Sequence, residues 1–168
     1  MTMSLKSVQD LLINELRDIY HAEQQLVKAL PKMAKAAKSD KLRQAFEHHL
    51  EETRGQVERL AQVFDKLDTR SRGKPCQAMQ GLIEEAKEMM EEIKTPEVLD
   101  VALISAAQKV EHYEIASYGS VGALAEALGE KEVAKLLGQT LEEEKQADQK
   151  LNLIALSDVN QTALKAVA

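Results

Sequence analysis

The stretch Val110-Glu111-His112-Tyr113-Glu114-Ile115-Ala116-Ser117-Tyr118 decides how this chain is understood, because it places acids inside an apolar helical pattern. Glu114 lies at the centre of that pattern, and Glu111 lies at its edge one turn earlier. A buried carboxylate without compensation costs several kcal/mol, so Glu114 requires a proton, a cation or a metal. The other members of the pattern recur at steps of three and four and share one helix face: Leu103, Ala107, Val110, Ser117, Val121, Leu124 and Leu128.

The composition indicates an all-α protein. The 168 residues are enough for one domain with a sizeable core, so we expect a single domain over residues 1–168. Hydrophobic residues make up 44% but aromatic ones only 3%, which leaves a core of aliphatic residues and Met. Seven Gly and three Pro allow few turns and therefore favour a small number of long helices.

Charge and cysteine content exclude several classes of protein. The net charge is −6 and Lys and Arg form no dense cluster, so we expect no nucleic-acid partner. The single Cys76 cannot form an internal disulfide, which fits a reducing compartment. The first residues carry no apolar signal core, and no run approaches the roughly 18 apolar residues of a membrane span. We expect a soluble, cytoplasmic protein with no membrane partner.

Periodicity and capping signals predict five helices, at about residues 8–36, 40–67, 77–93, 97–128 and 130–157. Ser7 with Asp10 and Ser39 with Asp40 mark two helix starts, and Pro96 fits the first position of another. Pro31 lies inside the first helix and predicts a kink. The segment 69–75 is the clearest linker.

The connections between these helices predict the topology. The first two long helices are joined tightly, as are the last two, whereas the long connection between the pairs carries the short helix. Two hairpins with one long crossover are the ferritin-like form of the four-helix bundle. A weak internal repeat supports a duplicated hairpin: His21-Ala22-Glu23 matches His112-Tyr113-Glu114, and Leu50-Glu51-Glu52 matches Leu141-Glu142-Glu143.

Each long helix carries an acid near its midpoint. The midpoints fall at about residues 22, 53, 112 and 143, close to Glu23, Glu52, Glu114 and Glu144. Each offset is two residues or fewer, which is roughly 3 Å along a helix. Because the midpoints of an antiparallel bundle share one height, we expect these four carboxylates to converge.

Converging carboxylates repel one another unless a positive charge compensates them, and no Lys or Arg occupies the centre of a stripe. Two metal ions in a carboxylate cage are the established solution in this class of bundle. Glu111, Asp148 and His49 lie within a turn of the central acids and extend the ligand set. Oxygen ligands with one imidazole suit iron or manganese, with zinc or magnesium as substitutes.

Several assignments remain open at the level of sequence. Glu52 flanks its stripe and could face the bundle or water. The stripe favours Glu144 as a ligand, whereas the internal repeat favours Glu143. His49 is either a ligand or a buried hydrogen-bonding partner of one. The remaining histidines lie off the stripes, with His21 and His48 expected at the surface and His112 on the wrong face, and Tyr20 is expected in the core.

The chain resembles the bacterial YciF-type ferritin-like stress proteins over nearly its whole length. The stretches that carry this likeness are 18–26 (DIYHAEQQL), 49–57 (HLEETRGQV), 106–118 (AAQKVEHYEIASY) and 140–145 (TLEEEK). The resemblance implies a ferritin-like bundle, a homodimer, a di-metal site and induction under osmotic or general stress, but no known reaction. The usual Glu-x-x-His pairs of ferritin-like proteins are missing, because Gly55 follows Glu52 and Ala147 follows Glu144 at that spacing.

Three functions fit these observations. The first is a di-metal protein, with iron preferred, that handles dioxygen or peroxide in stressed cells. The second is metal binding or sequestration without turnover, and the third is a metal-free helical dimer that binds a partner. The short helix with Met79, Met89 and Met90 is the candidate dimer face, and a cage is not expected because no further helix is predicted after Ser157.

Overall fold

The computed structural model describes residues 5–168, which form helices and no strand. Four long helices are present, namely α1 (Val8–Ala36), α2 (Asp40–Lys66), α4 (Pro96–Ala127) and α5 (Lys131–Ile154). The shorter α3 (Gln77–Glu92) lies in the connection between α2 and α4. No helix in this part of the chain is long and apolar enough to cross a bilayer. The predicted all-α class and bundle topology are confirmed.

Side-chain and backbone caps fix where the helices begin. Ser7 Oγ accepts from Asp10 N–H at 3.0 Å, and Asp10 Oδ2 accepts from Ser7 N–H at 3.0 Å, which forms a reciprocal capping box. Ser39 caps α2, and its own N–H donates to the buried Asp100 of α4 at 2.8 Å. The α4–α5 turn contains Gly129 at φ 78°, a conformation that glycine adopts without steric cost.

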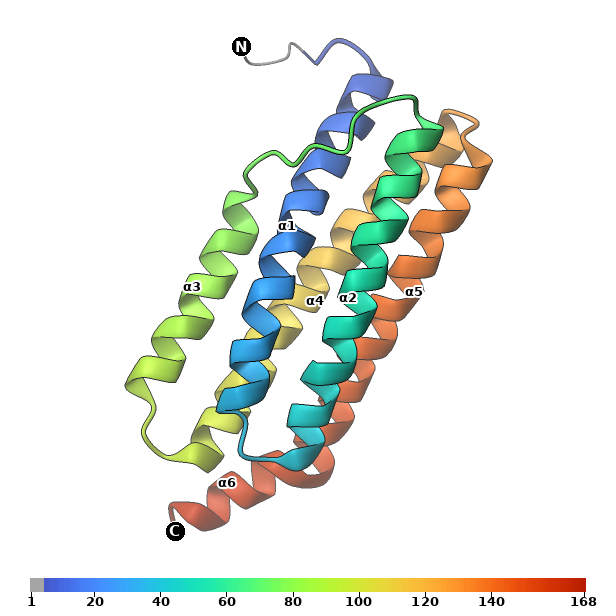
Figure 1. Ribbon diagram of the computed structural model, residues 1–168. Helices are drawn as coiled ribbons and strands as arrows, with labels where there is room; N and C mark the ends of the chain where they lie inside the picture. Colours follow the sequence, from blue (N-terminus) through green and yellow to red (C-terminus); the bar gives the residue numbers. More distant parts are fainter. Residues whose placement is uncertain (1–4) are drawn as a thin grey trace.

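The helices form two antiparallel hairpins that pack side by side (Figure 1). The first hairpin is α1–α2 and the second is α4–α5, with α2 against α5 and α1 against α4. Helix α3 lies outside this four-helix arrangement, against α4 and α1. The connection before it runs along α1, where Lys74 N–H donates to the carbonyl of Arg17 at 3.0 Å.

The core is divided along the bundle axis. One apolar cluster lies between the α1–α2 turn and mid-bundle and includes Leu26, Phe46, Leu103 and Leu151. The other lies towards the opposite end and includes Leu16, Phe64, Tyr118 and Leu137. Between these clusters, every long helix contributes buried polar side chains, which together are Glu23, His49, Thr53, Gln56, Glu111, Glu114, Thr140 and Glu144. We call this set the polar layer.

Two expectations from the sequence are wrong. The last helix does not end near Ser157, because α5 passes into a π-helical turn, η1 (Ala155–Val159), and the chain stays helical through α6 (Asn160–Ala166). Val159 and Ala163 are buried, so this extension packs on the bundle. The expected position of Met79 on an exposed face is wrong, because this residue is fully buried, whereas Met89 and Met90 of the same helix are half-buried.

Candidate metal centre

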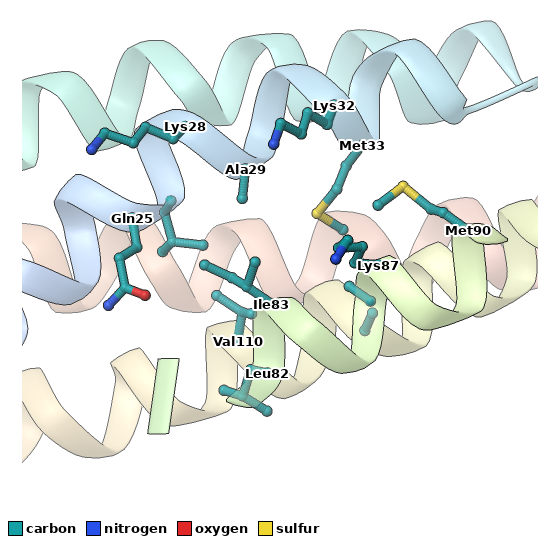
Figure 2. A pocket seen from close by; sticks show the side chains of 13 residues that line it. Gln25, Lys28, Ala29, Lys32, Met33, Leu82, Ile83, Lys87, Met90 and Val110 are labelled. Carbon is teal, nitrogen blue, oxygen red and sulfur yellow. The ribbon is translucent and has the colours of Figure 1, made fainter. Parts of the chain in front are cut away.

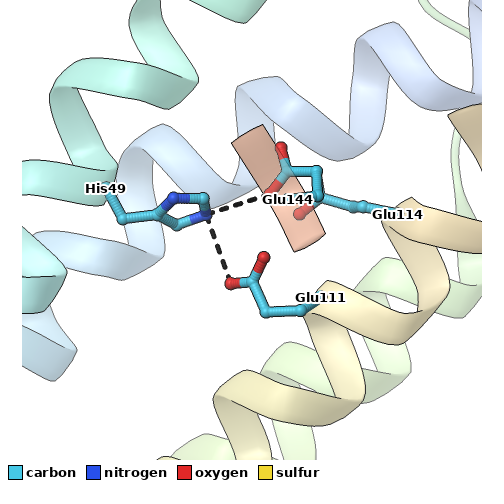
Figure 3. Close-up of side chains that lie close together, drawn as sticks. All are labelled: His49, Glu111, Glu114 and Glu144. Carbon is cyan, nitrogen blue, oxygen red and sulfur yellow. Dashed lines mark ion pairs between the residues drawn. The ribbon is translucent and has the colours of Figure 1, made fainter. Parts of the chain in front are cut away.

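Four side chains from three helices meet in the polar layer (Figure 3). His49 comes from α2, Glu111 and Glu114 from α4, and Glu144 from α5. One nitrogen or oxygen atom from each lies within 4.8 Å of the others, and all four residues are buried. His49 Nε2 is 3.2 Å from Glu111 Oε1 and 3.5 Å from Glu144 Oε2. The group therefore offers one imidazole and three carboxylates to a common point.

Local helix geometry explains why these residues meet. Glu111 and Glu114 are three residues apart, so they project from the same face of α4 on successive turns. On α2, the buried polar positions are His49, Thr53 and Gln56, again at helical spacing. Thr53 Oγ1 donates back to the carbonyl of His49 at 2.8 Å, so its hydroxyl is engaged on its own helix, while the imidazole of His49 lies towards the acids.

Glu23 of α1 belongs to the same polar layer and adds a fifth ionisable side chain to the group of four. Its side chain is fully buried, and its Oε1 accepts a hydrogen bond from the hydroxyl of Tyr118 on α4. Burial raises the Glu23 pKa to about 8, and the neighbouring Glu144 carboxylate raises it in the same direction. Each of the four long helices thus contributes at least one possible metal-ligating side chain to the layer.

The buried acids lack ordinary partners. Six of the eight carboxylate oxygens of Glu23, Glu111, Glu114 and Glu144 are buried without a hydrogen bond, and so is His49 Nε2. Burial, followed by mutual repulsion, raises the pKa values of Glu114 and Glu23. Burial likewise raises those of Glu111 and Glu144, although His49 acts against it in both. Burial alone would lower the His49 pKa, but Glu111, Glu52 and Glu144 raise it to about 10.

The side chains of His49, Glu111, Glu114 and Glu144 could together hold a metal ion. Buried charges in proteins are paired or coordinate metals, and one possible ligand atom from each of these four residues lies within 4.8 Å of the others. Carboxylate and imidazole groups are common metal ligands in proteins, and this set contains no thiolate.

Two of the residues expected to be ligands lie outside this group. Glu52 is 27% exposed, and its two oxygens lie 3.2 Å from His48 Nε2 and 3.1 Å from His49 Nδ1. Asp148 is half-buried and lies 3.3 Å from His112 Nε2 and 3.4 Å from Gln108 Nε2. Both acids are therefore engaged at the edge of the bundle.

The structure also separates Glu143 from Glu144. Glu144 is fully buried in the layer, whereas Glu143 forms a two-pronged ion pair with Arg59 at 2.8 and 2.9 Å. Gln56 Nε2 donates to the same Glu143 carboxylate at 3.1 Å. Of these two neighbours, only Glu144 has oxygens directed at the group.

The remaining histidines and Tyr20 take other positions. His48 and His112 are exposed, as expected. The expectation of a surface role for His21 is wrong, because it is half-buried and its Nδ1 accepts from Cys76 N–H at 3.1 Å. Tyr20 packs edge-on against Phe64, with ring centroids 5.6 Å apart.

Gln56 and Thr140 of the layer, and Tyr118 beside it, are residues that the sequence did not single out. Tyr118 lies four residues after Glu114 and hence on the same helix face, a signal present in the sequence. Gln56 and Thr140 gave no signal of their own, because neither residue type is diagnostic of a site. Arg59 Nη1 donates to Thr140 Oγ1 at 2.6 Å, so this residue supports the ion pair beside the layer.

A cavity away from the polar layer is lined mainly by apolar side chains (Figure 2). It has a volume of about 240 Å³ and lies between α1, α3 and α4. Its walls are apolar side chains such as Met33, Ile83 and Met90, with the amines of Lys28, Lys32 and Lys87 around them. No acid, His or Cys among the described residues lines it, so it lacks the carboxylate and imidazole groups of the polar layer.

Known proteins resemble this chain over almost its full length. A family model described as a domain of unknown function, DUF892, matches residues 7–164. Protein YciF of Escherichia coli K12 is 52% identical over 162 residues, which span 96% of this chain and 98% of that protein.

Solved structures of other proteins also resemble this chain. The crystal structure described as the E. coli stress protein YciF is 53% identical, with a TM-score of 0.89 over 93% of this chain and 99% of its own. YcfI of Rhodopseudomonas palustris is 49% identical, with a TM-score of 0.88 over 90% of this chain and 97% of its own. A protein of Xanthomonas campestris pv. campestris shares the fold at 20% identity, with a TM-score of 0.74 over 94% of this chain and 96% of its own.

Proposed function

This chain belongs to the DUF892 family, and from that premise we propose that it is a stress-associated protein that binds two metal ions, with iron preferred and manganese second, at the centre of its bundle. Glu23, His49, Glu111, Glu114 and Glu144 would hold the ions. The relative described as a stress protein supports the physiological setting, because it is similar over nearly the whole length of both chains.

The observation that carries this proposal is the set of buried carboxylates without hydrogen-bond partners. Replacing them with apolar residues would remove a large desolvation cost, so their presence calls for a compensating ligand. In the metal-free protein, protons would neutralise the acids, and each protonated carboxyl would offer one O–H to a neighbouring acid. Metal ions satisfy the charge and the lone pairs together.

When bound, iron or manganese would supply redox exchange with dioxygen or hydrogen peroxide. The protein residues have their own roles in that setting. Tyr118 donates to Glu23 and fixes the direction in which this carboxylate points. The apolar clusters on either side of the layer exclude bulk water, and a low local dielectric strengthens every charge interaction inside it.

The primary test is metal analysis of protein purified without chelator and then loaded with Fe(II), Mn(II) or Co(II). We expect two equivalents per chain in the native protein and fewer in Glu114→Gln and Glu114→Ala. Glu51→Gln is the matched control, because Glu51 is exposed on α2 and pairs only with Arg54 at 2.5 Å among the interactions of the described residues. Native protein that takes up no metal under any loading condition contradicts the proposal.

A second measurement decides whether the centre turns over. Consumption of hydrogen peroxide by the iron-loaded protein, lost in Glu114→Gln, supports redox chemistry. Full metal loading without consumption supports sequestration, and no metal at all leaves a helical interaction module. We extend the proposal to a homodimer in the cytoplasm. Light scattering of the purified protein would test the dimer, and cell fractionation would test the location.

A further inference from the structure

A narrow cavity reaches the proposed centre from the side of α2 and α5. Its volume is about 20 Å³, and it contacts His49 and Glu111 of the centre. Its walls include the apolar side chains of Phe46, Ala147 and Leu151, and the polar residues His48, Glu52 and Lys150 also line it. A space of this size holds about one water molecule. It therefore admits a small ion or molecule and excludes a chelate.

Glu52 spans this cavity from surface to centre. One of its oxygens lies 3.2 Å from the imidazole of His48, whose side chain is 61% exposed. Its other oxygen lies 3.1 Å from Nδ1 of His49, whose side chain is 7% exposed. The opposite ring nitrogen of His49 faces Glu111 and Glu144 (Figure 3). A single carboxylate thus stands between solvent and a buried donor.

We propose that this cavity is the port through which cations reach the centre, and that Glu52 is a transit residue and not a permanent ligand. This inference rests on the proposed function. A carboxylate at the mouth of a narrow passage concentrates cations there. Because the passage holds about one water, an entering ion must exchange most of its hydration shell for protein atoms, and Glu52 followed by His49 supplies them in order.

The arrangement argues against Glu52 as a resident ligand. Both of its oxygens already face imidazoles, and neither belongs to the group of atoms that lie within 4.8 Å of one another. Lys150 allows a second test, because removing its positive charge should change the rate of cation uptake in the opposite direction. It lines the same cavity, and its positive charge repels an incoming cation.

The test is stopped-flow uptake of Co(II) by metal-free protein, followed by its absorption and by the final stoichiometry. Removing one negative charge close to the path of a divalent ion slows uptake roughly tenfold in Glu52→Gln, with two equivalents still bound at the end. Lys150→Gln speeds uptake about two- to threefold, since its amine is exposed and better screened. Glu51→Gln, one residue away on the exposed face, leaves the rate unchanged.

A steric variant tests the passage independently of charge. Ala147→Phe fills the cavity from α5 and slows uptake at any ionic strength, whereas the effects of Glu52→Gln and Lys150→Gln shrink as salt is added. Circular dichroism checks that each variant folds.

The outcomes separate this inference from the proposed function. Uptake by Glu52→Gln and Ala147→Phe at the native rate overturns the port and leaves the metal centre standing. Loss of one equivalent at saturation in Glu52→Gln shows instead that Glu52 is a ligand, which overturns its transit role alone. Native protein that takes up no Co(II) overturns both proposals.

Discussion

The hydroxyl of Tyr118 donates a hydrogen bond to Glu23 Oε1 and so joins α4 to α1 inside the bundle. Both side chains are fully buried. The contact lies where the apolar cluster around Phe64 gives way to the polar layer. Its donor is the only tyrosine among the fully buried side chains of residues 5–168. The bond sets the orientation of an acid whose other oxygen has no protein partner.

Removing that hydroxyl should destabilise the metal-free protein. Tyr118→Phe leaves Glu23 Oε1 buried without a donor, so we expect the free energy of unfolding to fall by about 1–3 kcal/mol. Urea denaturation in the presence of a chelator measures this loss. Tyr20→Phe is the control, because Tyr20 contributes an edge-on ring contact with Phe64 that phenylalanine preserves. An equal loss in both variants would contradict the assigned role.

Stability of the metal-free protein should decrease as pH rises. Folding raises the pKa of Glu23 from 4.5 to about 8, so between these values the folded state holds a proton that the unfolded chain has lost. The His49 pKa rises from 6.5 to about 10, so its contribution is complete below 6.5 and is lost as pH rises towards 10. Both shifts make the free energy of unfolding fall as pH rises, by about 1.4 kcal/mol per pH unit for each proton that only the folded state retains.

Urea denaturation at a series of pH values between 5 and 9, with a chelator present, measures that dependence. In Glu23→Gln the slope should be shallower below pH 8, because one titrating carboxyl is gone. Metal-loaded protein should show weaker dependence or the opposite sign, since metal displaces these protons and binds more tightly as pH rises. Stability that climbs with pH in the metal-free native protein would refute the assignment of raised pKa values.

Neighbouring acids on α5 should respond differently to the same substitution. Glu144→Gln should reduce metal stoichiometry, because Glu144 is buried among the donor atoms. Glu143→Gln should retain two equivalents and lose at most about 2 kcal/mol of stability, since it weakens the ion pair with Arg59. Metal titration and urea denaturation of the two variants make the comparison. The reverse pattern would place the ligand at Glu143.

Asp100 should matter for stability and not for metal. It is buried, and its two oxygens accept from Lys38 N–H and Ser39 N–H, each at 2.8 Å. These bonds fix the turn that starts α2, so Asp100→Ala should cost about 2–4 kcal/mol. Asp100→Asn keeps one acceptor and should cost less. Thermal unfolding ranks the two variants, and a change in metal stoichiometry in either would show that the turn and the centre are coupled.

Much of the fold and part of the site follow from the sequence alone. Glu23, Glu114 and Glu144 sit on their helix stripes near mid-helix, and the structure places each in the polar layer. On α2 the same reasoning favoured Glu52, whereas the structure directs His49 inward. The two differ by one turn and by a rotation of about 60° at 100° per residue. A stripe containing the half-buried Leu50 and Val57 does not resolve such a rotation.

The internal repeat also fails to show which residues face the inside of the bundle. It pairs Glu23 with Glu114, and both are buried. It also pairs Glu52 with Glu143, and both lie half-exposed and engaged with cations or imidazoles at the edge of the layer. The repeat therefore identifies equivalent positions without showing which of them face inward. The helical extension through η1 and α6 was missed because Ser157 and Asp158 are typical of a helix end, while burial of Val159 and Ala163 favours continued packing.

Neither half of this chain can assemble the five-donor set by itself. The α1–α2 hairpin supplies Glu23 and His49, and the α4–α5 hairpin supplies Glu111, Glu114 and Glu144. Tight binding of metal by this set would therefore require the two hairpins to pack against each other, and a bound ion would link them. Loss of the ion should weaken the interface between the hairpins before either hairpin unfolds. The rate of amide hydrogen exchange at this interface should therefore rise as the metal concentration falls.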